Sequence, residues 1–301
     1  MSRRNLLTIV NFSANINSVS DMKKIHIFNP AAGKEKKIPK GLTEENYITK
    51  AVGDAEIFAK NICEKEDVHF IVHGGDGTIS EVANGIIKAG AGNRCILSVV
   101  PKGTGNDFIR SAEGTQSIDV IKFNDSYCIN SLNTGLDLRV VEEMEKAKKI
   151  PFVKGSFAYI LGVVSVLFKG IGEKWKLILE DAEGKTENFS HEEFSLALFA
   201  NGSFYGGGFK AAPLASLSDG LIDVILIKKV TKLTLLKLIL AYRAGKHFVG
   251  GEVAEKFKKY LIYRKCVRAK LENIKNICSD GEIIKTDKAD ISIIKNTLCY
   301  K

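Results

Sequence analysis

A glycine-rich loop with a single acid is the first group of residues that could do chemistry. It consists of Gly74, Gly75, Asp76, Gly77 and Thr78, between an apolar run and a helical pattern that begins near Thr78 or Ser80. Glycines let backbone N–H groups approach a phosphate closely, and a helix start favours an anion. An acid among phosphate donors makes most sense as a ligand of Mg²⁺ on a nucleotide. A tight strand-to-helix turn capped by Asp76 would use the same residues.

A second loop of this kind, PKGTGND, runs from Pro101 to Asp107 after the apolar run CILSVV. It combines glycines with Thr104, Asn106 and Asp107. Two such loops after neighbouring strands are hard to explain as coincidence, and they predict one nucleotide site. The sequence has no G-x-x-x-x-G-K-[ST] element, which excludes a P-loop enzyme. No G-x-G-x-x-G opens the first helix, which argues against a dinucleotide oxidoreductase.

The alternation of apolar runs and helical patterns from Lys24 to about Lys122 predicts βαβ units and a parallel sheet. Ligands of such sheets bind beyond the carboxyl ends of the strands, so NPAAG, GGDGT and PKGTGND should converge on one cleft. After Tyr127, strand-like runs separated by turn residues predict a mainly antiparallel second domain, a β-sandwich. We therefore expect a disordered extension over 1–22, an α/β nucleotide-binding domain over 23–125 and a β-rich domain over 126–285. The C-terminal segment 286–301 could return to the first domain.

Composition sets the class of protein. The chain has 301 residues, 45% of them hydrophobic, enough for two globular domains. The apolar run from Phe157 to Phe168 is too short to cross a bilayer, which takes about 20 residues. The six cysteines form no C-x-x-C pair, which favours reduced thiols in the cytoplasm. The first 21 residues lack a convincing cleavage site and are interpreted as an extension rather than a signal peptide.

Positive charge is concentrated in one segment. Lys228 to Lys275 holds 14 Lys or Arg and 3 Asp or Glu, a local net charge of +11 in a chain of net charge +9. Such a segment favours anionic lipid headgroups or nucleic acid, or it is a solvated helix face. No nucleic-acid motif with stacking aromatics is present. The run KLTLLKLILAYRAGKHF could lie on a membrane interface. The apolar helix expected from Gly155 to Lys169 is a second segment that could border a lipid-binding site between the domains.

The series NPAAG, GGDGT, PKGTGND, NGSFYGGG, SLSDGLIDV and SDGE, in this order, resembles the diacylglycerol kinase catalytic-domain family. That family includes bacterial soluble lipid kinases and is related to sphingosine and ceramide kinases. The resemblance extends from about Lys23 to about Lys285. GGDGT alone is less specific, because NAD kinases and 6-phosphofructokinases share it.

The resemblance implies a set of site residues. The predicted ATP site comprises Asn29, Pro30, Ala31, Ala32, Gly33, Thr49, Gly74 to Thr78 and Thr104, with Asp107 in the same cleft. Glu282 of SDGE is the implied base for the lipid hydroxyl, and Asp280 is the second choice. A structural Mg²⁺ is implied at Asp219, with the backbone carbonyls of Ser216 and Leu221. A hairpin turn at Asp219 and Gly220 would use the same residues without metal.

The sequence thus predicts a two-domain α/β lipid kinase, with a 6-phosphofructokinase/NAD-kinase-like first domain and a β-sandwich second domain. It would use ATP and Mg²⁺ to phosphorylate a lipid hydroxyl, first of all diacylglycerol to phosphatidic acid, as a peripheral protein on an anionic membrane. The alternatives are a kinase of another lipid, whether sphingoid, phosphatidylglycerol-like or prenol, and an NAD-kinase-like enzyme that phosphorylates a small molecule. A basic lipid-binding protein with decayed loops is disfavoured, because Asp76, Asp107, Asp219 and Glu282 are all present. The oligomeric state stays open, a homodimer included.

Overall fold

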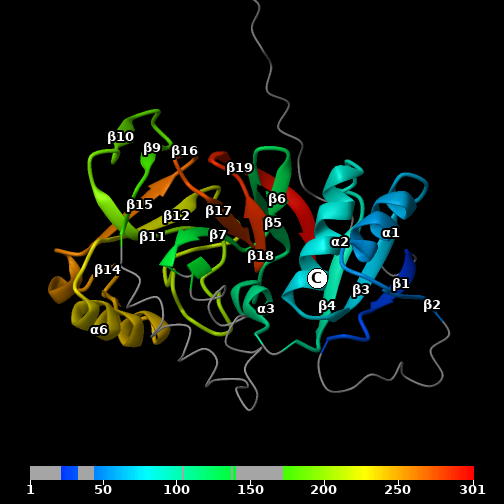
Figure 1. The fold of residues 1–301 in the computed structure, drawn as a ribbon. Helices are drawn as coiled ribbons and strands as arrows, with labels where there is room; N and C mark the ends of the chain where they lie inside the picture. The colour runs from blue at the N-terminus through cyan, green and yellow to red at the C-terminus, as the bar shows by residue number, and fades with distance from the viewer. Residues whose placement is uncertain (1–21, 33–43, 104, 137, 140–171) are drawn as a thin grey trace, which may run out of the picture.

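The computed structural model describes residues 22–32, 44–103, 105–136, 138–139 and 172–301 (Figure 1). Most of the predicted site residues lie in these ranges. Gly33, Thr104, the extension over 1–21 and the helix expected from Gly155 to Lys169 lie outside the described residues.

Four parallel strands carry the first domain, in the spatial order β2-β1-β3-β4. They are β1 (Lys23–Phe28), β2 (Glu45–Ile48), β3 (Val68–Gly74) and β4 (Ile96–Pro101). The helices α1 (Asp54–Cys63) and α2 (Asp76–Lys88) lie side by side against them (Figure 1). Helix α1 buries Ala55, Ala59 and Cys63, which recur every four residues and so share one face.

Helices α1 and α2 approach closely at Gly85. A Cβ added there would lie 2.5 Å from the Glu56 carbonyl oxygen and 2.8 Å from Ala59 Cβ. Only a glycine allows this distance between the two backbones. The contact fixes the direction of α2, whose first turn carries the glycine-rich loop.

A seven-stranded antiparallel sheet forms one layer of the second domain in the described part of the chain. Its order is β15-β12-β11-β7-β17-β18, and β8 also pairs with β11. The strands are β7 (Ser131–Gly135), β8 (Glu173–Lys174), β11 (Glu193–Ala200), β12 (Ile222–Lys228), β15 (Leu261–Cys266), β17 (Asn276–Ser279) and β18 (Glu282–Lys285).

The other layer faces this sheet across a core that includes Trp175, Phe194, Phe199 and Leu271, all fully buried. It contains β5 (Ser117–Phe123), β6 (Ser126–Cys128), β9 (Lys176–Glu180), β10 (Thr186–Asn188), β16 (Arg268–Glu272) and β19 (Lys288–Tyr300). The two layers form the predicted β-sandwich, so the two-domain α/β fold class is confirmed.

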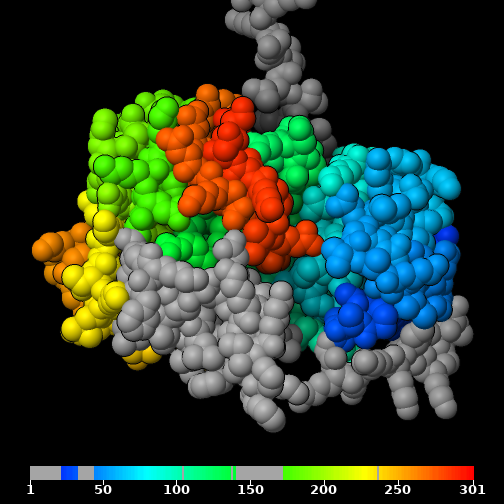
Figure 2. Space-filling view, viewed as in Figure 1, coloured from blue at the N-terminus to red at the C-terminus, as the bar shows by residue number. Residues whose placement is uncertain are grey.

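Strand β19 joins the two domains. It pairs antiparallel with β16 and β5, and its last residues, Cys299 and Tyr300, pair in parallel with Ile96 and Leu97 of β4. The parallel sheet and the outer sandwich layer are therefore one continuous sheet. Figure 2 shows the C-terminal segments, in orange and red, between the blue and green parts of the surface. Residues 286–301 thus reach the first domain.

Helix α6 (Lys232–Arg243) packs on the far side of the second domain (Figure 1). The Thr231 hydroxyl caps it by accepting the N–H of Thr234. Leu235, Leu238 and Tyr242 are buried. The remaining short elements are α3 (Asp107–Ser111), η2 (Glu255–Phe257), β13 (Phe248–Val249) and β14 (Glu252–Val253). No helix in the described ranges is long and apolar enough to span a membrane.

Candidate active site

The two glycine-rich loops meet at the carboxyl ends of β3 and β4. A Cβ added to Gly103 would lie 2.7 Å from Gly75 Cα, so the backbones touch. The Lys102 N–H donates to the Gly74 carbonyl at 3.0 Å and fixes this contact. Helix α2 begins at Asp76, two residues before the earliest predicted start, because Gly75 is extended and acts as the N-cap. Gly75 offers no side-chain cap, which leaves the first N–H groups of α2 available to an anion.

The NPAA segment lies beside the first loop. The Asn29 N–H donates to the His73 carbonyl at 3.2 Å, and the Asn29 side-chain amide donates to Thr78 Oγ1 at 2.8 Å. The Asn29 side-chain oxygen accepts the N–H of Ala31 at 2.8 Å, which forms the turn through Pro30 and Ala32. Thr49 is buried, and its backbone N–H donates a hydrogen bond to the Phe28 carbonyl at the same end of the sheet. These predicted ATP-site residues therefore gather at one edge of the sheet.

Asp76 and Asp107 face each other across Gly105. A Cβ on Gly105 would lie 3.0 Å from Asp76 Oδ2 and 3.5 Å from Asp107 Oδ2. Asp76 Oδ1 accepts the Phe108 N–H at 3.1 Å, so its carboxylate sits at the start of α3. An acid pair beside a phosphate cradle suits Mg²⁺, which binds through one or two carboxylates together with substrate phosphates.

Asp107 also holds the glycine-rich bend of the second domain. Its two carboxylate oxygens accept the N–H groups of Gly207 and Gly208, both at 2.7 Å. Burial raises the pKa of the Asp107 carboxyl, and the charge of Asp76 raises it further, while the two N–H donors act in the opposite direction. Both glycines have positive φ, at 84° and 102°, which explains the repeated glycines of NGSFYGGG.

Asp280 is the centre of a hydrogen-bond cluster that ties the two domains together. Its carboxylate accepts the backbone N–H groups of Ile129, Asn130 and Ser131 at 2.9, 2.9 and 3.1 Å. It also accepts the Ser80 hydroxyl of α2 at 2.9 Å and the Cys128 thiol at 3.1 Å. These five donors occupy the oxygens that would accept a substrate proton, so Asp280 is better placed to hold the site than to act as its base.

Glu282 starts β18 directly after the Asp280–Gly281 turn and is exposed. Desolvation of its carboxyl raises the pKa of Glu282, and the negative charges of Glu81 and Asp280 raise it further. Glu81 lies on α2, the helix that carries the glycine-rich loop. A carboxylate with a raised pKa is a better proton acceptor than an ordinary one.

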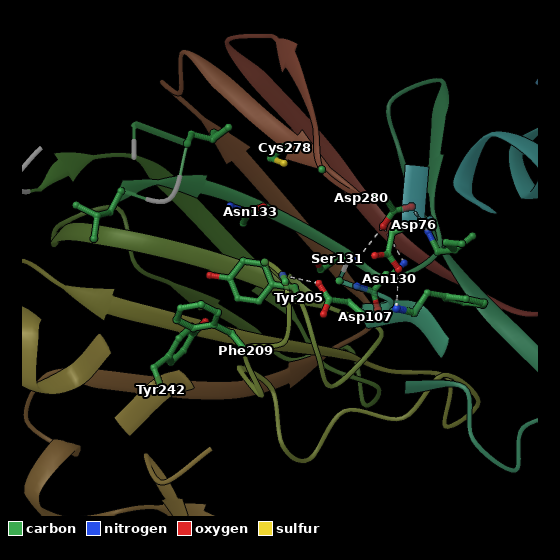
Figure 3. Close-up of a pocket in the computed structure, with 18 of the residues that line it drawn as sticks. Asp76, Asp107, Asn130, Ser131, Asn133, Tyr205, Phe209, Tyr242, Cys278 and Asp280 are labelled. Atoms are coloured by element: carbon green, nitrogen blue, oxygen red, sulfur yellow. Dashed lines mark hydrogen bonds between the residues drawn. The ribbon is translucent and has the colours of Figure 1, made fainter. Parts of the chain in front are cut away.

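A cavity of about 380 Å³ opens from these acids into the second domain (Figure 3). Asp76, Asp107 and Asp280 line its polar end. Most of the other side chains in the lining are apolar or aromatic, namely Phe108, Ile129, Leu136, Leu138, Tyr205, Phe209, Ile239 and Tyr242, and they are joined by Asn130, Ser131, Asn133 and Cys278. Glu282 is not among the lining residues, although the adjoining Asp280 and Gly281 are.

The sequence pattern did not single out the apolar residues of this cavity. They come from α3, from the residues just before and after β7, from the bend between Asn201 and Pro213, and from α6, which are far apart in the chain. The available signals were the repeated glycines of the bend and the apolar face of α6. Neither signal indicates which side chains meet.

The predicted metal residue Asp219 has a different neighbour from the one expected. Asp219 Oδ2 lies 2.6 Å from the Lys265 ammonium, and its Oδ1 accepts the Leu221 N–H at 3.0 Å. No group of three His, Cys, Asp or Glu residues that could hold a metal occurs in the described part of the chain. The Mg²⁺ assignment to Ser216, Asp219 and Leu221 stays a prediction.

Two family models match consecutive parts of the chain. The diacylglycerol kinase catalytic domain matches residues 23–133, and the YegS C-terminal NAD kinase beta sandwich-like domain matches residues 130–290. Together with the fold and the acidic cleft, these matches define a two-domain kinase in which an α/β domain is joined to an antiparallel sandwich.

Relatives agree with this class. A YegS-like lipid kinase from Enterobacter sp. (strain 638) is 30% identical over 194 residues, which cover 59% of this chain and 62% of that protein. A diacylglycerol kinase from Staphylococcus epidermidis is 30% identical over 247 residues, 73% of this chain and 75% of that protein. The crystal structure of a diacylglycerol kinase from Bacillus anthracis str. Sterne has the same fold, with a TM-score of 0.63 at 20% identity over 93% of this chain and 96% of that chain.

The chain therefore belongs to the family of diacylglycerol kinases and YegS-like lipid kinases. Membership of this kinase family implies ATP as the phosphoryl donor. The family resemblance predicted from the motif series is confirmed.

Proposed function

We propose that the protein transfers the γ-phosphoryl group of ATP to the hydroxyl group of a lipid, first of all diacylglycerol, with phosphatidic acid as the product. The observation that supports this most is the cavity of about 380 Å³, which has three carboxylates at one end and a mainly apolar and aromatic lining beyond them. A lipid has the same division, with a reactive hydroxyl at one end and acyl chains beyond it. A small polar acceptor would leave the apolar lining unused.

The nucleotide side of the proposal rests on the loop contacts. The N–H groups at the start of α2 and the closely packed Gly75 and Gly103 would hold the phosphates. Asp76 and Asp107 would hold Mg²⁺, which neutralises the charge of the phosphates during transfer. Asp107 would at the same time order the bend at Gly207 and Gly208, which links metal binding to the wall of the lipid pocket.

Glu282 would accept the proton of the lipid hydroxyl. Its raised pKa increases its basicity, and its exposure leaves it free to meet the acceptor where the cavity opens. Asp280 would be a positioning residue, because its donors come from α2 and from the chain just before β7. Most of the rate enhancement would come from positioning and charge neutralisation, as in other phosphoryl transfers.

Helix α6 supports peripheral binding to an anionic membrane. Leu233 and Leu240 are 63% and 67% exposed, and they share one face with the exposed Lys237. The opposite face packs inward, and Ile239 lines the cavity. Exposed leucines next to lysines fit the interface of an anionic bilayer, where each nearby cation contributes about 1 kcal/mol. Docking through α6 would bring the lipid to the apolar part of the cavity.

The assay for activity supplies radiolabelled ATP with either a total lipid extract or a pool of soluble metabolites, and mass spectrometry identifies the product. Label in the lipid phase, with diacylglycerol as the acceptor, supports the proposal. Label in soluble metabolites alone would overturn it. Gly77→Ala is a probe of the phosphate loop, because no atom lies within 4 Å of the added methyl group in the protein itself. It should keep the thermal stability of the free protein and raise KM for ATP.

The docking step is tested with Lys232, Lys237 and Lys246 changed to Gln. Arg243 is kept, because its guanidinium lies over the ring of Phe209, a cavity residue, at 5.7 Å. The matched control changes three exposed lysines of the β8–β10 region to Gln, namely Lys174, Lys176 and Lys185. The α6 variant should bind anionic vesicles less well than the control, and the difference should shrink as salt screens the charges. Equal binding of both variants at low salt would refute docking through α6.

A further inference from the structure

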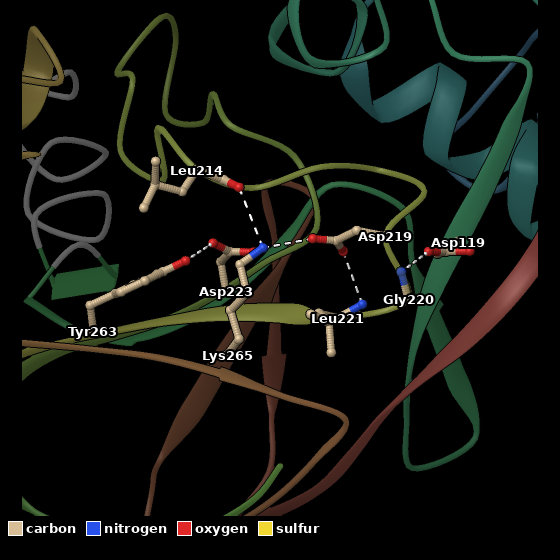
Figure 4. Close-up of polar contacts among 8 residues, drawn as sticks. All are labelled: Asp119, Leu214, Asp219, Gly220, Leu221, Asp223, Tyr263 and Lys265. Carbon is tan, nitrogen blue, oxygen red and sulfur yellow. Dashed lines mark hydrogen bonds and ion pairs between the residues drawn. The ribbon is translucent and has the colours of Figure 1, made fainter. Parts of the chain in front are cut away.

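Three aspartates and one lysine form a polar cluster on the side of β12 that faces the 214–221 loop (Figure 4). Asp119 and Asp223 are at most 1% exposed, and Asp219 lies in the loop. Lys265 reaches Asp219 and Asp223 from the neighbouring strand β15, where it pairs with Asp223 in the ladder, and Asp119 is linked to the loop through the Gly220 N–H. The cluster lies outside the cavity lining described above.

The Lys265 ammonium lies among three oxygens. It is 2.6 Å from Asp219 Oδ2, 3.3 Å from Asp223 Oδ2 and 3.5 Å from the carbonyl oxygen of Leu214. Asp223 Oδ2 is buried and accepts no hydrogen bond, so the ammonium is the charge that compensates it. The ammonium donates to Asp219 and Leu214 and forms an ion pair with Asp223, so all three of these oxygens lie around one positive charge.

The remaining carboxylate oxygens are also occupied. Asp219 Oδ1 accepts the Leu221 N–H at 3.0 Å, and Asp223 Oδ1 accepts the Tyr263 hydroxyl at 2.6 Å. The two oxygens of Asp119 accept the N–H groups of Gly220 and Asn296 at 2.6 and 2.7 Å. A divalent ion at Asp219 would compete with Lys265 for Oδ2, and it would be repelled by the ammonium for as long as Lys265 stayed.

Carboxylates and a carbonyl are the ligands that a hard divalent cation takes. Here a covalently attached cation already occupies the position between them. We infer that the Lys265 ammonium is the built-in cation of this loop, and that the native fold needs no divalent ion at Asp219. This inference competes with the Mg²⁺ site that the family resemblance predicts for Ser216, Asp219 and Leu221. It does not depend on the proposed kinase activity.

The first experiment uses the wild-type protein without nucleotide. A structural metal present at 100 times its Kd would raise the melting temperature by about 5–10 °C. We expect the same melting temperature in Mg²⁺ and in EDTA. In isothermal titration calorimetry with Mg²⁺, the wild type and Asp219→Asn should give the same heat. A melting temperature that rises saturably with Mg²⁺, and loses this rise in Asp219→Asn, would overturn the inference.

The second experiment removes the built-in cation. Lys265→Met leaves Asp219 and Asp223 without compensation, so the melting temperature should fall by several degrees and should then rise with Mg²⁺ or Ca²⁺. Adding Asp219→Asn to Lys265→Met should recover part of the stability and remove the response to metal. Lys270→Met, an exposed lysine on β16, is the matched control and should show neither effect. A Lys265→Met variant with wild-type stability would also overturn the inference, and if it fails to fold, the wild-type titration decides.

Discussion

Asp280→Asn separates a positioning role for this residue from a role as the catalytic base. The substitution keeps the size of the side chain, and Asn tolerates the positive φ of 48° found at this position. It replaces one oxygen by an amide nitrogen that cannot accept. If the nitrogen takes the Oδ2 position, it faces the Ile129 N–H, whose residue is 1% exposed, and the Ser80 hydroxyl.

The expected loss of stability can be worked out from these contacts. A hydrogen bond to a charged group contributes roughly 1.5–3 kcal/mol, and a buried donor left unpaired costs about 1–3 kcal/mol. The Ser80 hydroxyl can rotate and donate elsewhere, whereas the Ile129 N–H cannot. We therefore expect a loss of about 3 kcal/mol in the free energy of unfolding. This corresponds to a fall of roughly 6–12 °C in the melting temperature.

The assay is thermal and urea unfolding of Asp280→Asn, with kinase kinetics measured over a range of temperatures from well below the melting transition of the variant up into it. The control is Asp287→Asn, which removes the same charge from an exposed residue near the same hairpin. A positioning role predicts reduced stability together with activity that recovers in part on cooling. If Asp280→Asn melts like the wild type yet has lost its kcat at every temperature, Asp280 is the base and the argument from its five donors is wrong.

Three further predictions test other parts of the site. Glu282→Gln should reduce kcat by about 10²–10⁴-fold, with KM for ATP and melting temperature little changed. The base must be ionised to accept a proton, and the pKa of Glu282 is raised, so wild-type kcat should fall as the pH drops through that pKa. The variant should lose this acidic limb of the pH profile. An unchanged pH profile in Glu282→Gln would assign the base elsewhere. Asp107→Asn should lower both Mg²⁺ affinity and lipid turnover, since it removes the carboxylate charge and leaves the N–H of either Gly207 or Gly208 without its acceptor, and wild-type kinetics at limiting Mg²⁺ would contradict this. Gly85→Ala should destabilise the protein by roughly 1–3 kcal/mol, because its methyl group would lie 2.5 Å from the Glu56 carbonyl oxygen, and unfolding curves identical to those of Gly77→Ala would refute the close packing of α1 and α2.

The local features of the site were predictable from the sequence. The apolar runs of β3 and β4 and the glycines that follow them are contiguous in the chain, and their spacing indicates parallel strands that end in phosphate loops. The antiparallel second domain was also predictable from local signals, because strand-like runs and turn residues recur at short intervals along the chain. The start of α2 was misplaced by two residues, because Gly75 caps the helix through its backbone conformation and leaves no side-chain signal.

The tertiary structure alone decided the roles of the individual acids. Asp280 meets Ser80, 200 residues earlier in the chain, and Asp107 meets Gly207, 100 residues later. Asp219 meets Lys265 rather than an open site, because β12 and β15 are neighbours in the sheet. Periodicity and motif spacing report which face of an element a residue occupies, whereas the partner across that face depends on how distant elements pack. For this reason the sequence determined the class of protein and the two glycine-rich loops. Only the packing of the distant elements decided which carboxylate gathers five hydrogen-bond donors, which carboxylate stays exposed, and where the cavity lies.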